Sequence, residues 1–158
     1  MFQIPQKITG AIILGLIYMG IITTPDQLKG EVNSTSLQHL SGTMEIENGN
    51  KGGYSDLEDI QRLLYTGSVV LNRVNSPRWS GNNIEEVVLA KGQYASVTRD
   101  NFKTKKATER TIMLAKYLLI YGSIIPENVV YQGQGKNGSE EFARFHVKGD
   151  KDELFYYE

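Results

Sequence analysis

The side chains that could carry out chemistry in this chain are carboxylates, amides and aromatic rings. The sequence contains no cysteine, which excludes thiol nucleophiles, thiolate metal sites and disulfide bonds. Its two histidines, His39 and His146, lie far apart and lack the spacing of a metal-binding pair. A catalytic metal would need a site built from carboxylates, and we expect neither a metal nor a cofactor.

Five short motifs are informative in combination: ENGN at 47–50, VVLNRVNSPRW at 69–79, IEEVV at 84–88, GQYASV at 92–97 and PENVVYQ at 126–132. In this order and spacing they resemble the cell-wall hydrolases of the spore-cortex-lytic (SleB/CwlJ) type. The resemblance covers the chain from Met44 to the C-terminus, and VVLNRV with GQY is its more specific part. It implies a lysozyme-like lytic transglycosylase with a helical core and one essential glutamate.

The resemblance matches Glu47 to that glutamate, which opens a Glu-x-Gly motif. Taken alone, Glu47 would be interpreted as a solvated loop carboxylate, because most glutamates are exposed. The interval from Glu47 to Asn72 exceeds the family pattern by about two helical turns. An insertion around residues 51–56 explains the excess; otherwise Glu45 or Glu58 becomes the candidate.

One carboxyl group is chemically sufficient for such an enzyme. Cleavage of a β-1,4 glycosidic bond needs a proton on the leaving oxygen, and an apolar pocket can keep a glutamate protonated near neutral pH. The 6-hydroxyl of MurNAc can then attack and close a 1,6-anhydro ring. An ordinary hydrolase adds a second carboxylate. The nearest ones, Asp56, Glu58 and Asp59, stand at a predicted helix start, where capping and dipole roles are expected.

Glycan binding requires groups that pair with N-acetyl and hydroxyl substituents and stack on sugar rings. Gln93 and Tyr94 of GQY meet this need, and Tyr131 and Gln132 at the predicted strand region are a second contribution. The alternative for each is a turn amide or a half-buried sheet aromatic. We expect His146 to be a sheet residue. Where the family often closes with Gly-x-His-x-aromatic, this chain has GDKDELFYY at 149–157, so that histidine is missing.

Two helices are predicted to position these residues. Ser55 and Glu58 have capping-box spacing, and a run of apolar and small residues on one face follows until Pro77. The small residues Gly67 and Ser68 on that face favour close helix packing. Without the resemblance, Asn72 and Arg73 at the end of this helix would be structural hydrogen-bonding residues.

The remaining elements follow in a clear order. A short helix is expected at about 83–90, and Thr108 caps a second long helix that stops at Gly122. Short strands are expected from residues 128, 142 and 154, joined by glycine-rich turns. The predicted fold class is α+β and lysozyme-like, with a helical core and a small C-terminal antiparallel sheet.

The N-terminal run from Ile8 to Thr24 contains no charged residue and is at the short limit for a membrane-spanning helix. With Lys7 before it and Asp26 after it, the charge bias places the rest of the chain outside the cell. The predicted organisation is a membrane anchor at 1–24, a linker at 25–43 and a catalytic domain at 44–158. A cleaved signal peptide, giving a secreted protein, and a buried core helix are the alternatives.

The formal net charge of −1 disfavours a nucleic-acid partner. Together with the N-terminal segment, the resemblance implies a single-pass membrane enzyme that cleaves the β-1,4 MurNAc-GlcNAc bond of peptidoglycan. The alternative is a non-catalytic wall-binding or assembly factor that retains the fold. The position of Glu47 relative to Gln93 and Tyr94 separates the two hypotheses.

Overall fold

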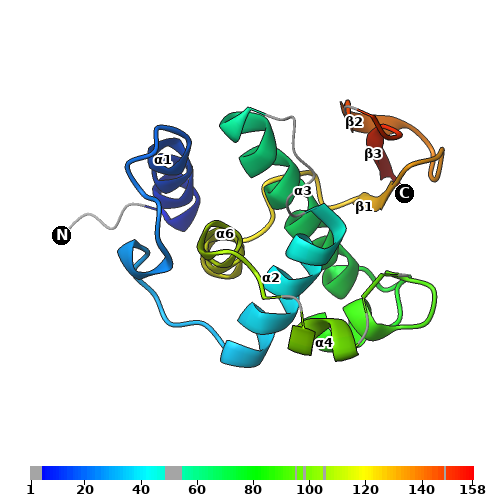
Figure 1. The fold of residues 1–158 in the computed structure, drawn as a ribbon, viewed down its shortest axis with the longest axis horizontal. Helices are drawn as coiled ribbons and strands as arrows, with labels where there is room; N and C mark the ends of the chain where they lie inside the picture. The colour runs from blue at the N-terminus through cyan, green and yellow to red at the C-terminus, as the bar shows by residue number, and fades with distance from the viewer. Residues whose placement is uncertain (1–4, 49–54, 95, 98, 105, 148) are drawn as a thin grey trace.

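The computed structural model describes residues 5–48, 55–94, 96–97, 99–104, 106–147 and 149–158. Its elements are α1 (Gln6–Tyr18), η1 (Pro25–Gln27), α2 (Ser34–Asn48), α3 (Asp56–Asn75), α4 (Ile84–Leu89), α5 (Arg99–Thr104), α6 (Glu109–Tyr121), β1 (Val129–Gly133), β2 (Glu141–Phe145) and β3 (Glu153–Tyr157). In Figure 1 the helices extend from α1 at one end of the molecule to the sheet at the other. The predicted α+β order, helices before sheet, is confirmed.

The central helix α3 begins as predicted. Ser55 accepts a hydrogen bond from the Glu58 amide, and the Glu58 carboxylate accepts one from the Ser55 amide. At Gly67 a Cβ atom would overlap the Leu118 side chain and lie 2.8 Å from the Met44 sulfur. Glycine is therefore required where α3 packs between α2 and α6.

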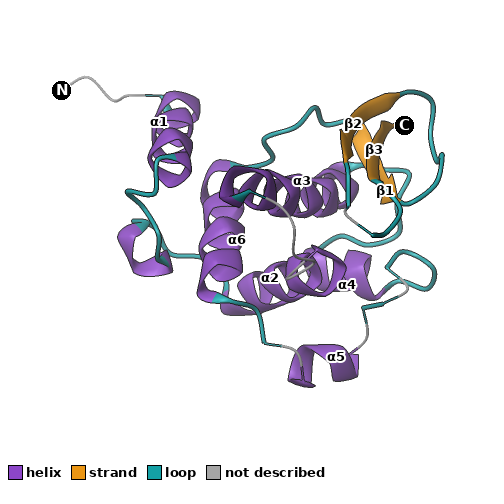
Figure 2. Ribbon diagram, turned by 45° about the horizontal axis from the view of Figure 1, so that its top comes forward, coloured by secondary structure: helices purple, strands orange, loops and turns teal. Residues whose placement is uncertain are grey.

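Helix α6 crosses α2 and α3 and supplies the middle of the main core. Thr108 caps its first turn, and Gly122 ends it with a φ of 90°, a conformation that favours glycine. Leu114 and Leu118 are fully buried within the cluster that α2 and α3 complete. Figure 2 shows these three helices packed together, with the sheet beyond α3.

The sheet is antiparallel in the order β1-β3-β2 and rests on the outer side of α3. A smaller core of Val69, Ile125, Val129, Phe145 and Phe155 joins sheet to helix. The Asn72 side chain donates to the carbonyls of Pro126 and Val129 at 2.8 and 2.9 Å. These two bonds attach the start of β1 to the end of α3, which is the structural role expected of Asn72.

The N-terminal segment differs from the predicted membrane-spanning helix. Helix α1 has 13 residues, ends at Tyr18 and packs on α6, where the Tyr117 hydroxyl donates to the Gly10 carbonyl at 3.0 Å. Ile17 is buried in the main core. Within the described part of the chain, no helix combines the length and apolar character that crossing a bilayer requires. The geometry is that of the core-helix alternative.

Residues 34–43 also differ from the expected linker, because they form the first ten residues of α2. Ser41 and Thr43 are buried, and their hydroxyls donate to the carbonyls of Leu37 and His39, four residues earlier. These bonds let a polar helix enter the core. Leu40 and Met44 on the same helix are fully buried. Helix α2 therefore belongs to the folded domain, and Glu47 lies in its last turn.

Candidate active site

Glu47 is held at the end of α2 by contacts of the next residue, Asn48. The buried Arg62 of α3 donates to the Asn48 carbonyl at 2.7 Å, and the Asn48 side chain donates to the Thr66 hydroxyl. The cation at this C-terminus complements the helix dipole and satisfies a terminal carbonyl. Glu47 itself is half-buried, with one carboxylate oxygen shielded from solvent. The expected insertion around residues 51–56 lies mostly outside the described residues, which omit 49–54.

The GQY motif forms the turn that follows α4. Gly92 has a φ of 81°, which favours glycine, and the backbone N–H of Gln93 donates to the Ala90 carbonyl at 3.1 Å. This turn brings the Tyr94 ring against the end of α3. There the Arg73 guanidinium lies 4.8 Å from the centre of the Tyr94 ring.

Arg73 connects the GQY turn to the sheet. Its Nε donates to the Val130 carbonyl at 2.7 Å, and its NH1 donates to the Gln93 side-chain oxygen at 3.3 Å. The same guanidinium lies over the Trp79 ring, with 4.2 Å between its carbon and the ring centre. A buried cation between two aromatic rings thus fixes the relative positions of α3, the turn and β1.

Strand β1 contributes Tyr131 and Gln132. The Tyr131 ring meets Trp79 edge to face at 5.5 Å between ring centres. The Gln132 amide donates to a carboxylate oxygen of Glu153, at the start of β3, at 2.6 Å. The other oxygen of Glu153 lies 3.8 Å from Arg62. Arg62 therefore contacts both the end of α2, where Glu47 lies, and the strand that supports Gln132.

All five residues singled out in the sequence line one cavity of about 320 Å³: Glu47, Gln93, Tyr94, Tyr131 and Gln132. Arg73, Trp79 and Glu153 share it, together with Gly92, Gly133, Gln134 and Asn137. Glu47, Gln93 and Tyr94 thus lie around one cavity, the arrangement under which the enzyme hypothesis gains over the binding factor. The cavity combines carboxylates, amides and aromatic rings, as a saccharide site requires.

The electrostatics of the cavity connect Tyr94 with Glu47. Burial raises the pKa of the Tyr94 phenol, the Arg73 cation partly offsets this, and the Glu47 carboxylate raises the pKa again. Tyr94 is therefore a neutral hydroxyl at physiological pH.

Three polar atoms in this cavity wall are shielded from solvent and have no hydrogen-bond partner among the described residues. They are the Tyr94 hydroxyl, the Trp79 indole nitrogen and the Gln132 side-chain oxygen. An unpaired buried polar atom costs about 1–3 kcal/mol. A polar ligand that formed hydrogen bonds with these atoms would recover that cost, so the shielded atoms favour the binding of a polar ligand over an apolar one.

The other carboxylates considered in the sequence have structural roles. Glu45 is buried and accepts hydrogen bonds from the Thr111 hydroxyl at 2.6 Å and the Thr108 amide at 3.2 Å, at the start of α6. Glu58 completes the capping box of α3, and the hydrogen bonds from Ser55 lower its pKa. Neither Glu45 nor Glu58 lines the cavity that contains Glu47.

Asp56 and Asp59 lie in the first turn of α3 and pair with Arg110, each at 3.2 Å. Asp59 also pairs with Arg62 at 3.3 Å. Neither carboxylate lines the cavity of Glu47. The capping and dipole role expected for the start of this helix agrees with their positions.

His146 follows β2 directly, is exposed, and pairs with Asp152 at 2.8 Å. It does not line the cavity of Glu47. Within the described residues, no group of three or more histidine or carboxylate side chains is arranged to hold a metal ion.

The sequence interpretation missed Glu153 and Trp79. Trp79 stood inside a quoted motif, and an aromatic ring close to the end of a helix was a usable signal. Glu153 had no such signal, because its register in β3 opposite Phe145 decides that it enters the cavity. Arg73 was assigned a structural role, and it has that role while also lining the site.

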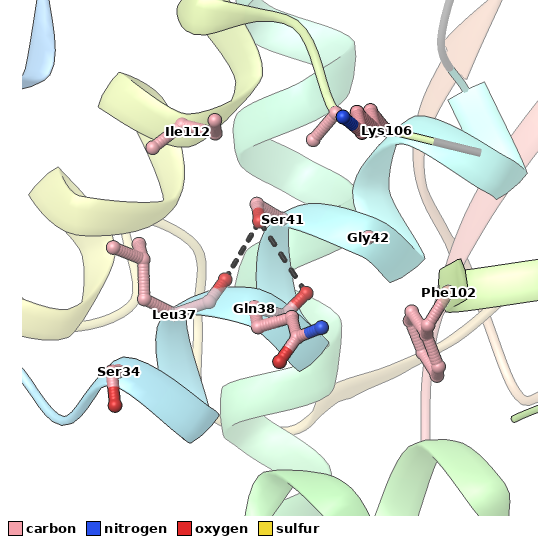
Figure 3. A pocket seen from close by; sticks show the side chains of 9 residues that line it. Ser34, Leu37, Gln38, Ser41, Gly42, Phe102, Lys106 and Ile112 are labelled. Carbon is pink, nitrogen blue, oxygen red and sulfur yellow. Dashed lines mark hydrogen bonds between the residues drawn. The ribbon is translucent and has the colours of Figure 1, made fainter. Parts of the chain in front are cut away.

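A second cavity, of about 360 Å³, lies between α2, α6 and Phe102 (Figure 3). Its wall is mainly apolar, with Leu37, Phe102 and Ile112 around it. The Ser41 hydroxyl is already bonded to the helix carbonyls of Leu37 and Gln38. No carboxylate lines this cavity, in contrast to the cavity of Glu47.

The fold and the first cavity define a small α+β protein with a carboxylate in a polar, aromatic cleft. A family model described as cell wall hydrolase matches residues 58–153, which is more than half of the chain, and the chain belongs to this family. Gln93, Tyr94, Tyr131, Gln132 and Glu153 lie within the matched span, whereas Glu47 precedes it. Neither the search of curated proteins nor that of solved structures gave a match.

The family suggests that the chain is an enzyme that cleaves peptidoglycan. The predicted cell-wall hydrolase family is thus confirmed.

Proposed function

We propose that the protein cleaves the β-1,4 MurNAc-GlcNAc bond as a lytic transglycosylase, with Glu47 as its acid. The observation that carries this proposal is the convergence of Glu47 with Gln93, Tyr94, Tyr131 and Gln132 on one cavity. The side chains come from α2, from the turn after α4 and from β1, so only the folded chain brings them together.

In the proposed reaction the Glu47 carboxyl group gives its proton to the glycosidic oxygen as the bond from C1 of MurNAc to that oxygen breaks. The 6-hydroxyl oxygen of the same MurNAc forms a bond to C1, and its proton passes to the Glu47 carboxylate. Glu47 is regenerated, no water is consumed, and the product ends in 1,6-anhydro-MurNAc. The tethered hydroxyl acts at a high effective concentration.

Glu153 is the second carboxylate of the cavity, and it favours one alternative, a hydrolytic muramidase. There it would activate water, as the second carboxylate of a glycosidase does. We favour the transglycosylase because Glu153 is 5% exposed, accepts a hydrogen bond from Gln132 and forms an ion pair with Arg62 at 3.8 Å. A carboxylate held in this way is better suited to positioning its neighbours than to receiving a proton from water.

Paired substitutions test the assignment of the acid. Glu47→Gln keeps size and polarity but cannot donate the proton, so peptidoglycan cleavage should fall by about 10²–10⁴-fold or more with the fold intact. Glu58→Gln is the matched control, because it makes the same chemical change at the exposed capping box. Normal cleavage by Glu47→Gln would place the acid elsewhere. An intact, glycan-binding protein that never cleaves would favour a non-catalytic wall-binding factor.

The cellular location remains a prediction. We propose that the enzyme works at the outer face of the cell membrane, where the glycan strands are within reach, or as a secreted protein. Carbonate extraction of the full chain tests this. Retention in the membrane fraction would support attachment to the membrane, and complete recovery in the soluble fraction would support the secreted alternative.

A further inference from the structure

The carboxylate of Glu153 determines how the Gln132 amide is oriented. One Glu153 oxygen accepts from the Gln132 nitrogen at 2.6 Å, and the other forms an ion pair with the buried Arg62. A carboxylate can only accept hydrogen bonds, so the Gln132 amide must turn its NH₂ group toward it. The Gln132 carbonyl is then the group left for a different partner.

Besides the Tyr94 hydroxyl, the shielded wall of the cavity therefore offers one acceptor, on Gln132, and one donor, on Trp79. The Gln132 side-chain oxygen is shielded from solvent and has no hydrogen-bond partner among the described residues. The same holds for the Trp79 indole N–H, whose ring is held between Arg73 and Tyr131. A secondary amide carries the complement of this pair, one N–H donor and one carbonyl acceptor. In a wall glycan that group is the 2-acetamido substituent of each sugar.

We propose that Glu153, backed by Arg62, is a positioning residue that sets the specificity of the cleft for 2-acetamido sugars. It holds the Gln132 carbonyl toward the acetamido N–H, while the Trp79 N–H donates to the acetamido carbonyl. This inference rests on the proposed function, because it assumes that the cavity binds the glycan.

A second amide-carboxylate pair at the same cavity provides a matched control. The Gln134 amide donates to Asp150 at 3.2 Å, and both residues are exposed. Water competes for such a pair, so its loss leaves the orientation of buried groups unchanged. Asp150→Asn therefore makes the same kind of change as Glu153→Gln at an exposed pair and leaves the shielded atoms of Gln132 and Trp79 in place.

The experiment measures the binding of chitotetraose and cellotetraose by calorimetry. The two sugars are neutral and differ in the 2-acetamido groups. The wild-type chain should prefer chitotetraose by at least about tenfold, which corresponds to one hydrogen bond of ordinary net strength. Glu153→Gln and Trp79→Phe should each bind chitotetraose about tenfold more weakly. Binding of cellotetraose should change little, and Asp150→Asn should behave as wild type.

Gln132→Met keeps the inference testable if Glu153→Gln fails to fold, because it removes the acceptor and retains the contact of Glu153 with Arg62. It should lose the preference for chitotetraose in the same way. A wild-type chain without that preference, or a folded Glu153→Gln or Gln132→Met that keeps it in full, would overturn the proposal. A chain that shows the preference but leaves peptidoglycan uncut would refute the proposed catalysis and support this inference.

Discussion

Replacing Arg62 by methionine should show how strongly the two sides of the cleft depend on one buried cation. Arg62 is fully buried, donates to the Asn48 carbonyl at 2.7 Å, and lies 3.8 Å from Glu153. Methionine fills much of the same volume with an apolar side chain. The substitution therefore removes the hydrogen bond and the charge while limiting the cavity that is left.

Two costs determine the magnitude. A helix-terminal carbonyl that loses its buried donor costs about 1–3 kcal/mol. A buried carboxylate that loses its cation costs about 3–5 kcal/mol. The costs do not add fully, because Gln132 still donates to Glu153. We expect Arg62→Met to lower the free energy of unfolding by about 3–5 kcal/mol. For a domain of this size the melting temperature should fall by about 6–20 °C.

Urea denaturation of the variant and its controls measures this cost. Arg110→Met is the matched control, because Arg110 pairs with Asp59 as Arg62 does but is exposed, so its loss should cost about 1 kcal/mol or less. The double variant Arg62→Met/Glu153→Gln removes the stranded charge and should be more stable than Arg62→Met alone. A loss below about 1 kcal/mol for Arg62→Met, or fully additive losses in the double variant, would refute this reasoning.

Two further substitutions test the helical core. Gly67→Ala should lower the free energy of unfolding, measured by calorimetry, by about 1–3 kcal/mol, because the added Cβ overlaps Leu118. Gly15→Ala, in an open part of α1, is the control and should be neutral or stabilising. Equal effects of the two substitutions would contradict the packing described. Burial raises the pKa of Tyr117 to about 12, so the folded state favours the neutral phenol. The stability that Tyr117 contributes to the folded state is fully present below pH about 10, the pKa in the unfolded chain, and is lost as the pH rises through about 12. Urea titrations in this window should show a weaker pH dependence for Tyr117→Phe, and an unchanged one would exclude Tyr117 as its source.

Elements with local signals could be predicted from the sequence. Ser55 and Glu58 predict the start of α3, and Thr108 predicts the start of α6, because each cap is a contact between near neighbours in the sequence. Helix α2 also has a local cap, because the Asn33 side-chain oxygen accepts a hydrogen bond from the Ser36 backbone amide at 2.9 Å. Its core positions are mostly small or polar, however, and its burial depends on α3 and α6, so the sequence shows no apolar face. The apolar run of α1 suits lipid and protein surfaces equally. Only the approach of Tyr117 and Tyr121 to Gly10 shows which surface it meets.

The site could be predicted in part for the same reason. Gln93, Tyr94, Tyr131 and Gln132 stand in motifs whose turn and strand form locally, and they do line one cavity with Glu47. Glu153 enters that cavity through the pairing of β3 with both neighbouring strands. A contact between residues so far apart in sequence leaves no local pattern, so the partner of Gln132 required the structure.

The most direct test of the central claim is mass analysis of the fragments released from purified peptidoglycan, before and after borohydride reduction. If Glu47 acts alone as acid and base, the fragments should end in 1,6-anhydro-MurNAc, which is lighter by one water than a reducing end and resists reduction. The same digestion with Glu47→Gln should release none. Fully reducible muramic ends from the wild-type chain would contradict the transglycosylase mechanism and assign the activation of water to Glu153.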